Sequence, residues 1–239
     1  MKNTDVNNLI RDHRRQWREC LYVYPVIARR SRGMSIGINL NPRMECTFAC
    51  AYCQVDRSVP RGLSEVQLPI LRDELLMAMT AAANGGIWRE ERFRAVPKRL
   101  RRVNDIAFSG DGEPTCMKNF DVAVQTAADI KKQMNLADVK IVVITNATQF
   151  RSSQFTRALP ILDANNGEIW AKLDAGTEEY FQRVNHPAGG ITLDSIVDDI
   201  AAVAGGRPIV IQTLFMLVDG MPPSEAEIKA YTRRLRKII

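Results

Sequence analysis

The feature that most constrains the fold of this 239-residue chain is an alternation of short apolar segments with amphipathic ones. The apolar segments predict β-strands at residues 35–40, 105–109, 140–145, 168–173 and 208–217. The amphipathic segments predict helices at residues 63–83 (broken near Pro69), 119–134, 152–162, 177–184 and 193–204, with a last helix capped by Ser224. Five strand–helix units in this order predict an α/β fold with a parallel sheet, either doubly wound or curved into a partial barrel.

Three cysteines lie within eight residues. Cys46, Cys50 and Cys53 have the spacing C-x3-C-x2-C, and the two histidines, His13 and His186, are distant in sequence. A structural zinc site takes four protein ligands, so three thiolates fill it only if one of these histidines folds back. Cysteine thiolates are also the ligands of iron–sulfur clusters, and three of them leave one iron of a cubane cluster open. Soft sulfur ligands suit both iron and zinc, so the residues alone leave open an iron–sulfur cluster, a zinc knuckle and a buried set of thiols without a role.

A second motif follows one strand–helix unit later. Residues 109–115 read Ser-Gly-Asp-Gly-Glu-Pro-Thr, and Tyr52 stands directly before the third cysteine. Together these motifs resemble the radical S-adenosylmethionine (SAM) superfamily, whose glycine-rich loop meets the amino group of SAM. Residues 24–42 look like a generically annotated subgroup, which is similar to the wybutosine-synthesising tRNA enzymes in its Gly-x-Gly-Glu-Pro-Thr loop. The chain lacks the extra cysteines that hold their second cluster.

The resemblance implies a fold and a division of the chain. Radical SAM enzymes have a partial (β/α)6 barrel, and five units are recognisable here, so we expect the barrel to be truncated after the fifth βα unit and the native chain to continue past Ile239. Residues 1–33 are expected to be a basic N-terminal extension packed on the barrel, and residues 34–239 the radical SAM core.

The resemblance also implies site residues. Cys46, Cys50 and Cys53 would hold a [4Fe-4S] cluster, and SAM would bind its open iron. Strands of such folds carry their chemistry at their carboxyl ends. The residues expected to bind SAM are Tyr52, Gly110, Gly112, Glu113, Asn146 and Asp174, with Lys172 as a further candidate. Gln212 could contact the ligand or only a backbone group.

Two cysteines lie outside the motif. Cys116 directly follows the glycine-rich loop and could donate a hydrogen atom to a substrate radical, although a small buried hydrophobe is the simpler interpretation. Cys20 lies in a helix-like basic stretch and is expected to be inert.

The implied function is reductive cleavage of SAM to a 5′-deoxyadenosyl radical that abstracts hydrogen from a substrate, with an electron donor such as flavodoxin or ferredoxin. The sequence identifies neither the substrate nor a catalytic residue for it. One alternative is an enzyme that modifies RNA, such as tRNA. Another is a non-catalytic iron–sulfur protein that binds a partner or transfers electrons.

The net charge of +6 is unevenly distributed. Residues 1–33 contain eight Lys and Arg against three Asp and Glu, and residues 89–102 contain seven against two. Trp17 and Phe93 lie inside these stretches and Trp88 directly precedes the second, a pattern that suits nucleic acid, because bases stack on aromatic rings. A solvated face is the alternative. The sequence contains no apolar stretch long enough to span a membrane and no apolar signal segment, so we expect a cytoplasmic protein, where thiolates stay reduced.

Overall fold

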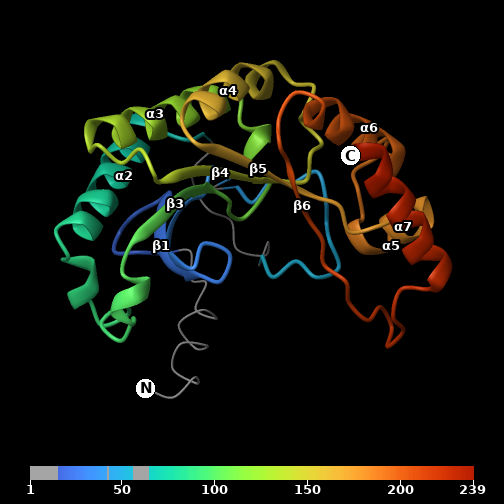
Figure 1. Cartoon of the computed structure of the whole chain (residues 1–239), viewed down its shortest axis with the longest axis horizontal. Coiled ribbons are helices and arrows are strands. Elements are labelled where there is room, and N and C mark those ends of the chain that lie inside the picture. The colour runs from blue at the N-terminus through green and yellow to red at the C-terminus, as the bar shows by residue number, and fades with distance from the viewer. Residues whose placement is uncertain (1–15, 42, 56–64) are drawn as a thin grey trace.

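A computed structural model describes residues 16–41, 43–55 and 65–239 of the chain. Its centre is a six-stranded sheet in the order β1-β2-β3-β4-β5-β6 (Figure 1). The strands are β1 (Val23–Ala28), β2 (Gly33–Ile38), β3 (Val103–Phe108), β4 (Lys140–Thr145), β5 (Gly167–Lys172) and β6 (Val210–Gln212). Strands β2 to β6 are parallel, whereas β1 pairs antiparallel with β2 at one edge.

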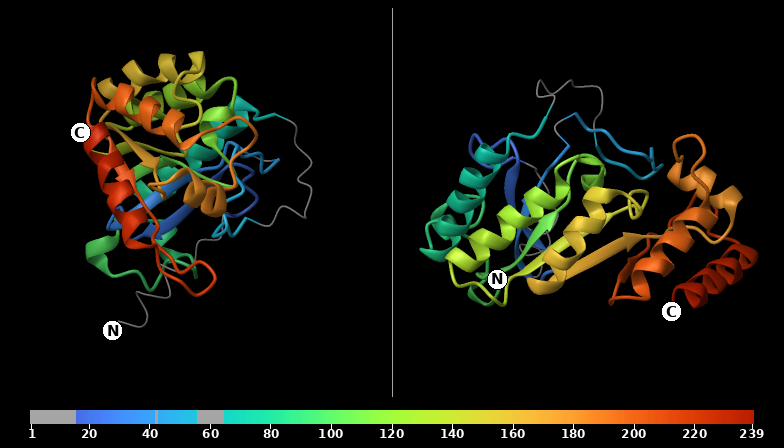
Figure 2. Two further views of the ribbon diagram at one scale, coloured as in Figure 1. Left: turned by 90° about the vertical axis from the view of Figure 1, so that its right-hand side faces the viewer. Right: turned by 90° about the horizontal axis from the view of Figure 1, so that it is seen from above.

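The helices lie along the outside of the curved sheet and leave its inner face open (Figures 1 and 2). They are α2 (Leu68–Ala83), α3 (Phe120–Gln133), α4 (Ser153–Ala164), α5 (Glu178–Asn185), α6 (Leu193–Ala204) and α7 (Glu225–Ile238), with short 3-10 turns η1 (Ile87–Arg89), η2 (Lys98–Leu100) and η3 (Pro114–Cys116). The predicted α/β fold is therefore confirmed, and the arch is a partial barrel. In the part of the chain that is described, no helix combines the length and apolar character needed to cross a bilayer.

The core lies between the sheet and the outer helices. Phe108 of β3 packs edge-on against Phe120 of α3, with ring centroids 5.6 Å apart. Phe155 of α4 stacks on Phe150 at 4.4 Å and on Phe120 at 6.4 Å. These rings fix α3 and α4 on one face, so alternate strand residues such as Ser35 point to the open inner face.

The chain between residues 16 and 33 differs from its prediction in two respects. Residues 23–28 form β1, which was not predicted, and the helix-like stretch around Cys20 is instead a turn in which the Cys20 amide donates to the Trp17 carbonyl. The sheet thus includes residues on both sides of the expected boundary at 33. Residues 1–15 lie outside the described part, and the division into extension and core stays a prediction.

Strand β6 is shorter than predicted. It covers three residues rather than residues 208–217, because the Leu214 amide turns away from the ladder and donates to Asp174 Oδ1 at 2.9 Å. The apolar residues that follow are largely exposed, including Phe215 and Leu217. The apolar composition of residues 213–217 predicted a longer strand, but the Leu214 amide binds the Asp174 carboxylate instead of a neighbouring strand.

One helix start needed correction and another is confirmed. Pro69 does not break α2; it lies in the first turn, where a missing amide costs little. The predicted start at residue 63 falls outside the described residues. Ser224 caps α7 as predicted, by accepting from the Glu227 amide. The Glu227 carboxylate accepts from the amides of Gly176 and Thr177 ahead of α5, which ties the two helices together.

Candidate functional site

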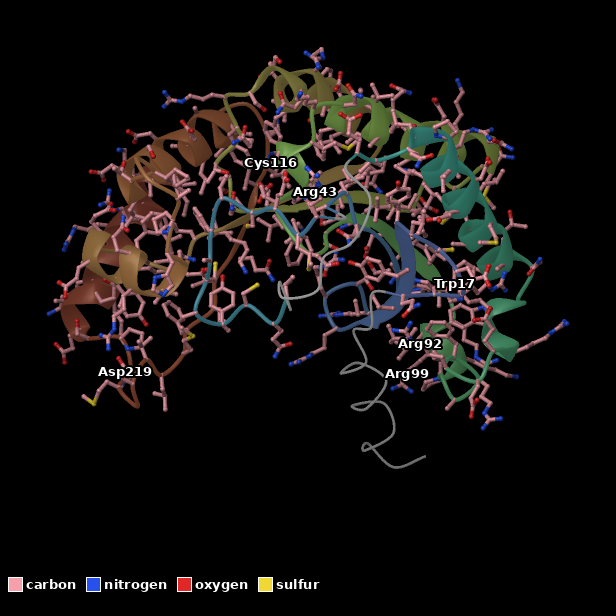
Figure 3. All side chains as sticks on the ribbon, turned by 180° about the vertical axis from the view of Figure 1, so that it is seen from behind. Trp17, Arg43, Arg92, Arg99, Cys116 and Asp219 are labelled. Carbon is pink, nitrogen blue, oxygen red and sulfur yellow. The ribbon has the colours of Figure 1, made fainter. Side chains whose placement is uncertain are left out.

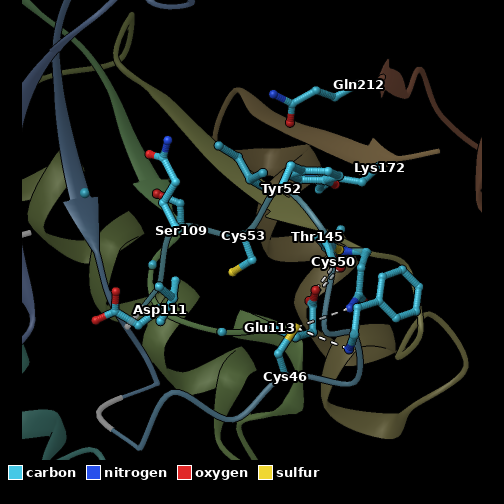
Figure 4. Close-up of a pocket in the computed structure, with 18 of the residues that line it drawn as sticks. Cys46, Cys50, Tyr52, Cys53, Ser109, Asp111, Glu113, Thr145, Lys172 and Gln212 are labelled. Carbon is cyan, nitrogen blue, oxygen red and sulfur yellow. Dashed lines mark hydrogen bonds between the residues drawn. The ribbon is translucent and has the colours of Figure 1, made fainter. Parts of the chain in front are cut away.

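A cavity of about 540 Å³ occupies the inner face of the sheet (Figure 4). The predicted residues that line it are Cys46, Cys50, Tyr52, Cys53, Gly110, Gly112, Glu113, Asn146, Lys172 and Gln212. They come from the carboxyl ends of five strands, where parallel strands bring their following loops together. The fold therefore unites the cysteine motif and the glycine-rich loop in one cavity.

The cysteine loop is held by the end of α5. The Ala49 amide donates to the carbonyls of Asn185 and His186, both at 3.1 Å, and the Ala51 amide donates to the Val184 carbonyl at 2.8 Å. Because the last carbonyls of a helix lack intrahelical partners, they are available as acceptors for such a loop. His186 thus comes near the cysteines through its backbone, and its side chain is exposed.

Two asparagine amides point at cysteine sulfurs. Asn185 Nδ2 lies 3.5 Å from Cys50 Sγ, and Asn146 Nδ2 lies 3.8 Å from Cys46 Sγ. Cys46 and Cys50 are half-buried, whereas Cys53 is exposed. N–H groups aimed at sulfur stabilise thiolate over thiol and tune the potential of a cluster bound there.

Gly112 lets the glycine-rich loop approach the cysteine loop. A Cβ atom at this position would lie 2.0 Å from the Glu45 carbonyl oxygen, so no other residue fits without displacement. The Glu113 amide donates to that carbonyl at 3.2 Å, and Asn41 Nδ2 donates to the Glu113 carbonyl at 3.1 Å. The two motifs are therefore joined through the backbone.

Glu113 is buried and joins two loops. Its carboxylate accepts from the amide and hydroxyl of Thr115, from Thr145 Oγ1 at 2.6 Å and from the Asn146 amide at 2.7 Å. Burial raises the pKa of this carboxyl, and the four hydrogen bonds oppose the rise. The carboxylate thus fastens the loop after β3 to the loop after β4. Its predicted contact with SAM stays a prediction.

Asp174 lies behind Tyr52, not among the described residues that line the cavity. It accepts from the Tyr52 hydroxyl, from Asn185 Nδ2 at 2.9 Å and from the Leu214 amide. Burial raises the pKa of Tyr52 far above its usual range, and the Asp174 charge adds to this. Lys172 Nζ sits 4.5 Å from the centre of the Tyr52 ring. The structure therefore places Asp174 as a support for the cysteine loop.

Gln212 presents an unused acceptor. Its buried Oε1 has no hydrogen-bond partner within the described structure, and Figure 4 shows the side chain beside Tyr52 and Lys172. Buried polar atoms are rarely left unpaired in proteins. A ligand with a donor group in this cavity would satisfy it, whereas no backbone group among residues 16–41, 43–55 and 65–239 donates to this oxygen.

Cys116 does not line the cavity formed by the described residues. It is half-buried, and burial raises the pKa of its thiol to about 12, with Glu113 and Cys46 adding to the rise. Burial likewise raises the pKa of Cys20 to about 11, with the Glu74 charge contributing. In the cluster-free protein both thiols therefore stay protonated near neutral pH.

Four of the lining residues that sequence reasoning did not name as site residues come from β1, β2 and the turn between them. They are Tyr24, Arg29, Arg30 and Ser35. Tyr24 lies across Gly37, where a Cβ atom would come within 2.3 Å of its ring, and its hydroxyl donates to the Ser109 carbonyl at 3.0 Å. The missed signal was the apolar run of residues 23–28, rich in Val, Ile and Tyr, which is typical of a buried strand.

Among the described residues, no group of three or more His, Cys, Asp or Glu is placed to hold a single metal ion. The three thiols line one cavity and are half-buried or exposed. Cysteine thiolates are the ligands of iron–sulfur clusters, so the donor set fits a cluster by its chemistry.

Comparison with known proteins gives distant relatives. No family model matches the chain. A UPF0026 protein from Methanocaldococcus jannaschii is 26% identical over 183 residues, covering 74% of this chain and 48% of the relative. A UPF0026 protein from a Synechocystis species is 28% identical over 169 residues, covering 70% and 54%. The chain thus spans about half the length of these curated relatives.

Solved structures share the fold at low identity. A radical SAM methyltransferase from Sphaerobacter thermophilus has a TM-score of 0.58 and 15% identity, covering 90% of this chain and 55% of that one. SuiB of Streptococcus suis bound to S-adenosylmethionine has a TM-score of 0.55 and 13% identity, covering 87% and 40%. Archaeal TYW1 has a TM-score of 0.52 and 13% identity, covering 100% and 80%. The chain has the fold of the radical SAM enzymes, and the resemblance first carried by its cysteine motif is confirmed at that level.

Proposed function

We propose that this protein is a radical SAM enzyme that holds a [4Fe-4S] cluster through Cys46, Cys50 and Cys53 and binds SAM in the adjoining cavity. The observation that carries the proposal is the meeting of these cysteines with the glycine-rich loop at one edge of the sheet. The shared fold supports it. The chain spans about half the length of the curated relatives that it matches, so the activity of the whole protein is also proposed.

When bound, the reduced cluster supplies the electron that cleaves SAM into methionine and a 5′-deoxyadenosyl radical. The residues of the chain position and shield that chemistry. Lys172 offers a cation to a carboxylate, and the orphaned Gln212 Oε1 offers an acceptor to an amino or hydroxyl group. Gly112 keeps the glycine-rich loop close to the cysteines. Cys53 is exposed, so an electron donor such as flavodoxin or ferredoxin would approach from its side.

The test is anaerobic reconstitution with iron and sulfide, followed by SAM and a reductant, with 5′-deoxyadenosine measured. Replacing Cys46, Cys50 or Cys53 by Ala should remove most of the iron and all of the product. Cys20→Ala and Cys116→Ala are the matched controls and should keep both. A cluster that survives Cys50→Ala would refute the ligand assignment. A stable cluster with no SAM binding would favour the electron-transfer alternative.

Nucleic acid is a second candidate for the substrate, because residues 16 and 17, in the described part of the first basic stretch, contact residues 90 and 92 of the second. Trp17 Nε1 donates to Glu90 Oε2 at 2.8 Å, and Arg92 Nη1 donates to the Gln16 carbonyl at 3.2 Å. Figure 3 shows Trp17, Arg92 and Arg99 on the same side of the molecule. One basic surface would suit an RNA substrate.

A further inference from the structure

We propose that the floor of the cavity is a subsite for an anionic group of the substrate, formed by Arg30 with Arg29 at its edge. The subsite deepens the proposed function, because it identifies a chemical class for the molecule that the radical would attack. Both arginines line the cavity, and neither belongs to the cysteine or glycine-rich motif.

The two arginines lie at the end of the cavity opposite the cysteines. They follow β1, and since β1 is antiparallel to β2, Ala28 pairs with Gly33 at the start of β2. The cysteines follow the other end of β2. A strand of six residues extends over roughly 17 Å, so the cavity has a cysteine end and an arginine end separated by about that distance.

Arg30 is held in a defined orientation. Its Nη2 donates to Asp105 Oδ1 at 2.9 Å and to Ser35 Oγ at 3.2 Å. Its guanidinium carbon lies 5.1 Å from the centre of the Trp170 ring, and the side chain is only 16% exposed. Orienting an arginine in advance lowers the entropy lost when an anion binds.

The remaining donors of Arg30 are available. Within the described structure Nη2 alone makes hydrogen bonds, which leaves Nε and Nη1 without protein acceptors. Nε and Nη1 lie on opposite sides of the planar guanidinium, so each of them can donate a separate hydrogen bond to an anion.

The charges of the cavity favour an anion at this end. The two lining carboxylates, Asp111 and Glu113, lie at the cysteine end and accept hydrogen bonds from the protein. Asp105 balances the charge of Arg30, so the net positive charge comes from Arg29, which is exposed and makes no ion pair with any described residue. A substrate that spans the cavity would therefore carry its anionic group roughly 10 Å or more from the reacting carbon.

The experiment titrates the anaerobically prepared full chain with inorganic phosphate, and separately with acetate, by calorimetry at low ionic strength. We expect one phosphate per chain, with binding weakened at least fivefold by Arg29→Gln and by Arg30→Lys. Arg30→Lys keeps a cation beside Asp105, so it should fold, but it removes the guanidinium donors Nε and Nη1. Arg32→Asn, on the same exposed turn but away from the cavity, is the matched control and should bind like the unaltered protein.

The outcomes separate the possibilities. Acetate binding with the same variant pattern would identify a carboxylate substrate, and phosphate binding alone a phosphorylated one. Absence of binding of either ion would overturn the subsite, as would equal binding by all the variants. Loss of binding in Lys172→Gln alone would also overturn it, because the ion would then sit at the cysteine end. The titration requires neither SAM nor catalysis, so the subsite and the radical chemistry can fail independently.

Discussion

At the scale of single residues, Glu113 of the glycine-rich motif has a structural role, because its carboxylate links the loops after β3 and β4. Its buried carboxylate has four protein donors, so Glu113→Ala would leave several buried groups without an acceptor. We expect the free energy of unfolding to fall by about 3 kcal/mol or more, measured by urea denaturation of the cluster-free protein. The control is Glu45→Ala, whose side chain is 70% exposed and should change stability little. Equal stability of the two variants would contradict the role assigned to Glu113.

We expect the Cys116 thiol to react slowly with alkylating reagents, although it directly follows the glycine-rich loop. Because burial raises the pKa of its thiol to about 12, its thiolate fraction at pH 8 is roughly a thousandfold below that of an ordinary cysteine. We expect iodoacetamide to label the exposed Cys53 of cluster-free protein long before Cys116 at pH 8. Labelling of Cys116, followed by mass spectrometry, should rise about tenfold per pH unit and still be rising at pH 10. Comparable rates at pH 8 would show that the thiol is not protonated there.

At the scale of elements, the joint between the two motif loops depends on Gly112. An alanine here would place its Cβ 2.0 Å from the Glu45 carbonyl oxygen, so one loop must move. We expect Gly112→Ala to lower both the melting temperature and the iron bound after reconstitution. Gly189→Ala is the control, since nothing lies within 4 Å of a Cβ atom there. Full iron loading in Gly112→Ala would mean that the loops need not stay in contact.

The bounds of helices and strands were predictable from sequence where neighbouring residues alone determine them. The strand at residues 140–145 and the helix at residues 193–204 appear with the predicted bounds, because apolar periodicity and flanking turns suffice for both. Strand β1 was missed and β6 was predicted too long. Both lie at edges of the sheet, where pairing on one side only leaves the outcome to contacts such as that of Leu214 with Asp174.

At the scale of the whole molecule, the joined basic stretches predict salt-dependent binding of RNA. Arg101 should be kept, because its guanidinium supports its own segment through the carbonyls of Val96 and Arg94. Replacing the exposed Arg99 and Arg102 by Ser should lower the slope of log affinity against log salt by about 1.5, because roughly two fewer phosphates are neutralised.

Filter binding with tRNA at low and moderate salt measures this effect. The matched control replaces two exposed arginines of α7, Arg233 and Arg236, by Ser; this helix lies at the opposite end of the arch from the basic stretches (Figure 1). Neither variant should change SAM cleavage. If tRNA is not retained even at low salt, or if both variants weaken retention equally, the basic surface is a solvated face.

The sequence by itself determined the parts of the site that are carried on one loop. The spacing of Cys46, Cys50 and Cys53 and the composition of the glycine-rich loop are local, so they predicted a cluster motif, which stays a prediction, and the fold, which is confirmed. Only the tertiary structure decided what surrounds them. Asn185 reaches Cys50 across 135 residues and Arg30 reaches Asp105 across 75, through pairings set by strand order and register. Such contacts join residues that are distant in sequence, so they depend on the packing of the whole chain and cannot be predicted from a local sequence pattern.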